Sequence, residues 1–119
     1  MRRYSLNDGS GLSRLNLLTP DTVARLLVFM ANSPYRESWI GLLPVGGEDG
    51  TLAQRFRGTA GQGRVRAKTG SLTHVSALSG YLDANDGHLL AFSMFVNNYN
   101  AGTREIREVM DRIVNALIQ

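Results

Sequence analysis

The sequence predicts an α+β domain in which a short antiparallel sheet is flanked by helices. Helical periodicity occurs near both ends of the 119-residue chain, and three strand-like runs separated by turn signals lie between. The composition, 43% hydrophobic and 19% charged, is that of an ordinary folded chain. We therefore expect residues 1–119 to form a single segment with a modest core.

The first helix is expected to begin at Pro20, with Thr19 as its N-cap residue. Its apolar residues recur at helical spacing: Val23, Leu26, Leu27, Met30 and Ala31. A short second helix is expected between Pro34 and Leu42, and a helical turn over 52–56. These elements precede the sheet, and one face of the sheet is expected to be covered by the Thr19 helix or by segments outside this sequence.

The middle of the chain predicts three strands. In the first, Val65 and Ala67 point to one face, and Arg64, Arg66 and Lys68 to the other. The second is expected over 76–82 and the third over 88–97, after a turn at 83–87. The third strand is nearly all apolar, so we expect it to be covered on both faces.

A last helix is expected over 103–118 as the second cover of the sheet. Its apolar residues repeat at helical spacing: Ile106, Val109, Met110, Ile113 and Leu117. The charged residues fall elsewhere on the helix and predict a solvated face with i,i+4 pairs such as Glu108 with Arg112.

The candidate site is the run Lys68-Thr69-Gly70-Ser71 at the end of the first strand. It combines an ammonium group with two hydroxyls. Gly70 places no side chain between the backbone and a ligand lying along the strand edge. The pattern favours an anionic ligand, although an exposed lysine before a turn would give the same tripeptide.

Further motifs accompany Lys68-Thr69-Gly70, a tripeptide of penicillin-binding proteins and serine β-lactamases. They are Asp8-Gly9-Ser10-Gly11-Leu12-Ser13-Arg14, Gly50-Thr51-Leu52 and Val75-Ser76-Ala77-Leu78-Ser79-Gly80-Tyr81. Together the set resembles the D-alanyl-D-alanine carboxypeptidase/endopeptidase family, of the penicillin-binding protein 4 type. The resemblance runs from about Asp8 to Asn98. It implies the sheet and terminal helix of the β-lactamase/transpeptidase-like (DD-peptidase) fold, as the C-terminal part of a longer catalytic domain.

The resemblance also implies roles for the candidate site. Lys68 would lend positive charge to the proton network, and Thr69 and Ser71 would hold the substrate carboxylate. The Ser71 backbone N–H would be one oxyanion donor, which makes Lys68 and Ser71 the catalytic candidates. The implied partners are a peptidoglycan stem peptide ending in D-Ala-D-Ala, β-lactams, and the N-terminal part of the same domain. The implied location is periplasmic or extracytoplasmic.

The family's Ser-x-x-Lys nucleophile motif is absent, because Lys68 is the only lysine and position 65 is valine. Ser5-Leu6-Asn7 spells the family's Ser-x-Asn motif but lies in the wrong place, directly before Asp8. Ser10 and Ser13 have no lysine or histidine nearby in sequence. We therefore expect the isolated chain neither to hydrolyse D-Ala-D-Ala peptides nor to bind penicillin covalently.

Two alternatives remain open from the sequence. A non-catalytic remnant could still bind wall peptides or a protein through the same strand. Nucleic-acid binding through Arg64, Arg66 and Lys68 is disfavoured, because residues 60–72 contain no aromatic residue for stacking. The net charge of +3 fits any anionic partner.

Cofactor and metal sites are not expected. The chain has no cysteine, and its two histidines, His74 and His88, lie apart in the sequence. No apolar run approaches the ~20 residues of a membrane-spanning helix. No signal-peptide pattern follows the N-terminus, so export would depend on a segment outside this sequence.

Overall fold

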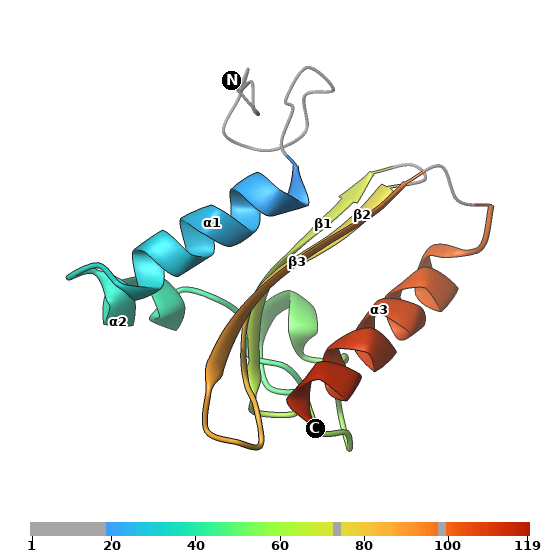
Figure 1. Cartoon of the computed structure of the whole chain (residues 1–119). Coiled ribbons are helices and arrows are strands. Elements are labelled where there is room, and N and C mark those ends of the chain that lie inside the picture. The colour runs from blue at the N-terminus through green and yellow to red at the C-terminus, as the bar shows by residue number, and fades with distance from the viewer. Residues whose placement is uncertain (1–18, 73–74, 98–99) are drawn as a thin grey trace.

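The chain forms a three-stranded sheet with helices on both faces (Figure 1). The computed structural model describes residues 19–72, 75–97 and 100–119. Three antiparallel strands follow the order β1-β2-β3, namely β1 (Val65–Leu72), β2 (Val75–Asp83) and β3 (Leu89–Asn97). The helices are α1 (Pro20–Ala31), α2 (Arg36–Gly41) and α3 (Thr103–Ile118), with a 3₁₀ turn, η1 (Gly50–Leu52). The predicted α+β class, meander and terminal helix are confirmed.

Helix α1 begins as its capping residues predict. The Thr19 hydroxyl accepts a hydrogen bond from the Thr22 N–H at 3.1 Å, and Pro20 occupies the first helical position. The expected helical turn over 52–56 is wrong in place, because the only regular turn here is η1. Phe56 has a φ of +66°, which a right-handed helix does not permit, and its side chain is buried.

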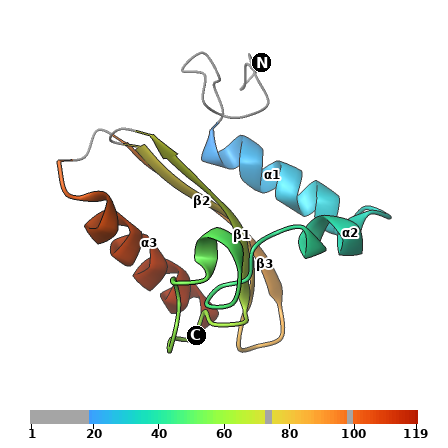
Figure 2. The ribbon, with the colours of Figure 1, turned by 180° about the vertical axis from the view of Figure 1, so that it is seen from behind.

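The main core lies between the sheet and α3. Its fully buried members come from η1, from strands β1 and β2, and from α3: Leu52, Val65, Ala67, Leu78, Leu82, Met110, Val114 and Ile118. A smaller cluster on the opposite face joins α1, α2 and β2 through Leu27, Ile40 and Tyr81. Figure 2 shows α3 on one side of the sheet and the α1–α2 pair on the other.

The apolar arc of α3 is wider than the surface it buries. Met110, Val114 and Ile118 face the sheet, whereas Val109, Ile113 and Leu117 remain 46–48% exposed. The expectation that one apolar stripe packs on the sheet is thus only half right. Periodicity defines the arc, but the position of the sheet decides which part of it is buried.

Strand β3 departs from expectation in a related way. Both of its faces are in contact with a core cluster, through Leu89 and Ala91 on the α1 face and Phe92 on the α3 face. The cover is only partial, because Phe92 alone is buried and Leu90 is 39% exposed. On α3 the expected Glu108–Arg112 pair is also replaced, because Arg104 Nε lies 3.3 Å from Glu108 Oε1 instead.

Candidate functional site at the edge of the sheet

The run Lys68-Thr69-Gly70-Ser71 lies within β1, an edge strand of the described sheet. β1 pairs with β2 in antiparallel register, with Lys68 opposite Ser79 and Gly70 opposite Ala77. The predicted site residues are therefore held by a continuous ladder on one side. Their other side is the outer edge of the sheet.

The first half of this outer edge is closed by the segment 44–46. The Ala67 N–H donates to the Pro44 carbonyl at 3.0 Å, and the Gly46 N–H donates to the Val65 carbonyl at 2.8 Å. Backbone groups of alternate residues point to the same edge of an antiparallel strand. The N–H and C=O groups of Thr69 and Ser71 therefore also point outward, beyond the end of this segment.

No backbone group of the described residues pairs with this second half of the outer edge. The Lys68 side chain is exposed, and its Nζ donates to the outward-pointing Thr69 carbonyl at 2.6 Å. The ammonium group is thereby brought to the open edge, although Lys68 itself belongs to the α1 face of the strand. Thr69 is half-buried and Ser71 exposed, and alternation places both on the opposite face.

Gly70 is not required by the packing of the chain itself. It is exposed, and a Cβ there would meet only the Ala77 Cβ, at an ordinary contact distance of 3.4 Å. The glycine instead leaves the backbone bare beside the open edge. This geometry suits an extended ligand that pairs with the strand.

Two serines that sequence reasoning did not select lie in the same row as Lys68. The register aligns Lys68 with Ser79 and Ser79 with Ser93, and the two hydroxyl oxygens are 2.8 Å apart. The sequence did contain a signal for this alignment. The alternation of β2 and the turn at 83–87 together fix the register of β2 with β3, which places Ser79 opposite Ser93. The row continues the polar character of the Lys68 strand across the sheet.

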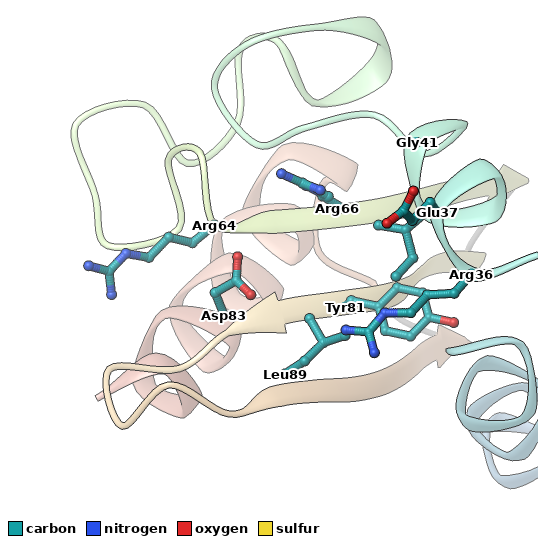
Figure 3. A pocket seen from close by; sticks show the side chains of 9 residues that line it. Arg36, Glu37, Gly41, Arg64, Arg66, Tyr81, Asp83 and Leu89 are labelled. Atoms are coloured by element: carbon teal, nitrogen blue, oxygen red, sulfur yellow. The ribbon is translucent and has the colours of Figure 1, made fainter. Parts of the chain in front are cut away.

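A cavity of about 260 Å³ lies farther along the same face, between β1 and α2 (Figure 3). Its charged lining residues come from α2, from β1 and the residue before it, and from the end of β2: Arg36, Glu37, Arg64, Arg66 and Asp83. Tyr81 forms part of its floor, and its buried position raises the pKa of the phenol. Three guanidinium groups here lie near two carboxylates, so the positive charge is partly offset. Lys68, in contrast, forms no salt bridge with a described carboxylate.

Several predicted features lie outside the described residues: the motif at 8–14, Ser5, Ser10, Ser13 and His74. Within the described part of the chain, no group of three histidine, aspartate or glutamate side chains is placed to hold a metal ion. No helix among these residues has both the length and the apolar character needed to cross a membrane.

Comparison with known proteins identifies the family. The model of the D-Ala-D-Ala carboxypeptidase 3 (S13) family matches residues 1–117. The chain belongs to this family. A D-alanyl-D-alanine carboxypeptidase of Actinomadura sp. (strain R39) is 54% identical over 102 residues, which cover 82% of this chain and 19% of the relative. Penicillin-sensitive carboxypeptidase A of Dictyostelium discoideum is 36% identical over 118 residues, which cover 93% of this chain and 23% of the relative.

Comparison with solved structures confirms the fold. Penicillin binding protein 4 (dacB) from Haemophilus influenzae superposes with a TM-score of 0.87 and 32% identity, over 98% of this chain and 28% of that one. The Bd0816 predatory endopeptidase from Bdellovibrio bacteriovorus superposes with a TM-score of 0.81 and 20% identity, over 98% of this chain and 32% of that one. This chain therefore spans about a fifth to a third of the proteins that it resembles.

Proposed function

We propose that this chain supplies the substrate-binding strand of a serine-type D-Ala-D-Ala carboxypeptidase or endopeptidase. The observation that carries the proposal is the open edge at Thr69 and Ser71, with the Lys68 ammonium beside it. A peptide can extend the sheet there through main-chain hydrogen bonds. Membership of the S13 family and the carboxypeptidase names of the relatives support the substrate class.

In the proposed mechanism a serine outside β1 attacks the carbonyl of the D-Ala-D-Ala bond. The Ser71 N–H donates to the oxyanion as it develops, where a hydrogen bond is strongest because charge is forming. Lys68 stabilises negative charge in the proton-transfer network, and the Thr69 and Ser71 hydroxyls bind the terminal carboxylate. The peptide bond then breaks, the terminal D-alanine leaves with the proton of the serine on its amine, and the acyl-serine intermediate remains. Water hydrolyses this ester and restores the serine, with no metal or cofactor involved. A β-lactam would acylate the same serine, and a solved complex of penicillin binding protein 4 with a β-lactam supports this ligand class.

We further propose that the preceding part of a longer protein completes the domain. An apolar cavity of about 350 Å³ wraps around the outer edge of β3 and reaches α3. Its lining includes Met94, Phe95, Val96, Val109 and Ile113. The low coverage of the relatives is consistent with a partner segment from the same polypeptide. A peptidoglycan substrate places the complete enzyme outside the cytoplasm.

The first test of this function is acylation by fluorescent penicillin, read by intact mass. The 119-residue chain should stay unlabelled, because no Ser-x-x-Lys motif is present. In a complete carboxypeptidase that contains this segment, Lys68→Ala should slow acylation about 100-fold or more. Arg66→Ala is the matched control, since it removes a positive charge two residues away on the same face of β1.

An unchanged acylation rate in Lys68→Ala would contradict the role proposed for Lys68. Labelling of the isolated chain at any serine would overturn the claim that the nucleophile lies elsewhere. Equilibrium binding of a D-Ala-D-Ala peptide by the isolated chain, without turnover, would instead favour a non-catalytic binding module.

A further inference from the structure

A second charged feature lies on the other side of the sheet from Lys68. A groove of about 790 Å³ runs between the loop after η1 and one flank of α3. Five arginines line it, two from the loop and three from the helix: Arg55, Arg57, Arg104, Arg107 and Arg112. We call this feature the arginine groove. None of the motifs that indicate the peptidase family falls within it.

The groove is held in shape by contacts between the loop and the helix. Arg55 binds Asp111 through two hydrogen bonds, of 3.1 and 2.6 Å, and the two side chains are only 12% and 16% exposed. The Asn115 side-chain oxygen accepts from the Gly61 N–H at 2.8 Å. Phe56 anchors the loop in the main core. The loop and helix are thus preorganised, which lowers the entropy cost of binding a ligand between them.

Charge within the arginine groove is unbalanced. The lining carries two carboxylates, and both are occupied: Asp111 by Arg55, and Glu108 by Arg104 at 3.3 Å. Three arginines remain: Arg57, Arg107 and Arg112. None of these three forms a salt bridge with any described carboxylate. Arg57 donates to the Gln54 side chain, a neutral partner.

We propose that the arginine groove binds a linear polymer that carries repeated phosphodiester groups and no nucleobases. Guanidinium groups present paired N–H donors that match the oxygens of a phosphate. The three uncompensated arginines come from separate positions on the loop and the helix, so they suit several phosphates in a row. Because no residue of the run 68–71 lines the groove, this binding is independent of the function proposed for that run.

The absence of stacking groups separates this ligand from a nucleic acid. Proteins that bind single strands combine positive charge with aromatic side chains on which bases stack. Among the described residues that line the groove, Phe56 is the only aromatic one, and it is 4% exposed. The groove therefore offers guanidinium contacts to a phosphate backbone and no exposed aromatic face on which a base could stack.

The test uses the 119-residue chain and a fluorescent oligomer of glycerol phosphate, with binding followed by anisotropy. We expect binding that weakens as salt rises, since phosphate contacts release counterions. The double variant Arg107→Gln with Arg112→Gln should bind at least about tenfold more weakly, because two guanidinium contacts are lost. Both side chains are exposed, so circular dichroism should show an unchanged fold.

The matched control is Arg25→Gln with Arg64→Gln, which removes the same charge away from the groove and should change affinity less than about twofold. Equal weakening in both double variants would overturn the proposal in favour of a net-charge effect. Undetectable binding of the glycerol phosphate oligomer would also overturn the proposal. The same holds if inorganic phosphate displaces the oligomer when both are present at equal molar concentration. Tighter binding of oligothymidylate would overturn it in favour of a nucleic-acid ligand.

Discussion

The two faces of the sheet are packed to different degrees. On the α3 face, Val65, Leu78, Leu82 and Val114 are completely buried in one continuous core. The α1 face has a cluster with only three buried members, Leu27, Ile40 and Tyr81. α1 also exposes Leu26, Val28 and Phe29, at 51–68%. Burial of apolar area is the main source of stability. The α3 face should therefore hold the fold together, and the α1 face should open first.

The two proposed sites lie beside differently packed parts of the chain. Lys68 and its row of serines belong to the face with the smaller cluster, whereas the arginine groove borders the larger core. Regions with few buried contacts open locally at lower free energy than the rest of a domain. The α1 face is thus the part of the chain most open to reshaping by a contacting segment or ligand.

The strongest test of the α3 face is Gly80→Ala in β2. A Cβ there would lie 2.1 Å from the Arg66 carbonyl oxygen and 2.5 Å from the Ala67 Cα, both backbone atoms. β1 and β2 must separate to accept it, so we expect a loss of more than about 4 kcal/mol in the free energy of unfolding. Urea denaturation followed by circular dichroism measures this loss.

Gly41→Ala is the control for that substitution. It ends α2, and a Cβ there meets nothing within 4 Å. Stability should be unchanged or higher by about 0.5 kcal/mol, since alanine favours the helix. Similar losses in both variants would show that close approach at Gly80 does not determine the pairing of β1 with β2.

The next largest effect compares matched leucines on the two faces. Leu82→Ala, in the main core, should cost about 3 kcal/mol and lower the protection of all three strands against hydrogen exchange. Leu27→Ala, in the smaller cluster, should cost about 2 kcal/mol and lower protection mainly in α1. If the α1 and β1 amides exchange at the same rate as each other in both variants, the two faces do not differ in stability.

The smallest effect is expected at Tyr81. Its hydroxyl donates to the Leu27 carbonyl and accepts from Trp39 Nε1 at 3.0 Å, which ties β2 to both α1 and α2. Tyr81→Phe removes both hydrogen bonds and should cost about 1–2 kcal/mol. Thermal unfolding at neutral pH measures this cost, and an unchanged melting temperature would argue against it.

Tyr81 also predicts a pH dependence. Burial raises the pKa of its phenol above the ordinary value of about 10. Above pH 10 the unfolded chain releases this proton while the folded chain retains it, so stability falls as pH rises toward the folded pKa. Tyr81→Phe should make that decline shallower, and an equally steep decline in this variant would contradict the prediction.

The sequence was sufficient for the elements whose signals are local. Thr19 and Pro20 located the start of α1. The alternation of β1 predicted that Val65 and Ala67 share one face, and the structure buries that face in the main core. Features that depend on distant contacts were not predictable. The closure of half of the β1 edge needs Pro44 to meet Ala67, and the backbone of Phe56 is held at positive φ by packing.

The candidate site shows the same limit. Its residues could be selected because Lys68, Thr69, Gly70 and Ser71 are consecutive. The row with Ser79 and Ser93 required the register of three strands. The arginine groove could not be predicted for a similar reason. The i,i+4 spacing favours Glu108 with Arg112, whereas the structure pairs Glu108 with Arg104 and leaves Arg112 in the groove lining.

The composition of β3 has a consequence for handling this chain. Leu89–Asn97 reads LLAFSMFVN, with no charge and no proline, and β3 is an edge strand among the described strands. Charged residues and prolines are the usual protection of such an edge against pairing with the same strand of a second molecule. Nine such residues are long enough to seed stacked, fibre-like aggregates. In concentrated solutions, the isolated chain should therefore aggregate first through pairing of β3 between molecules.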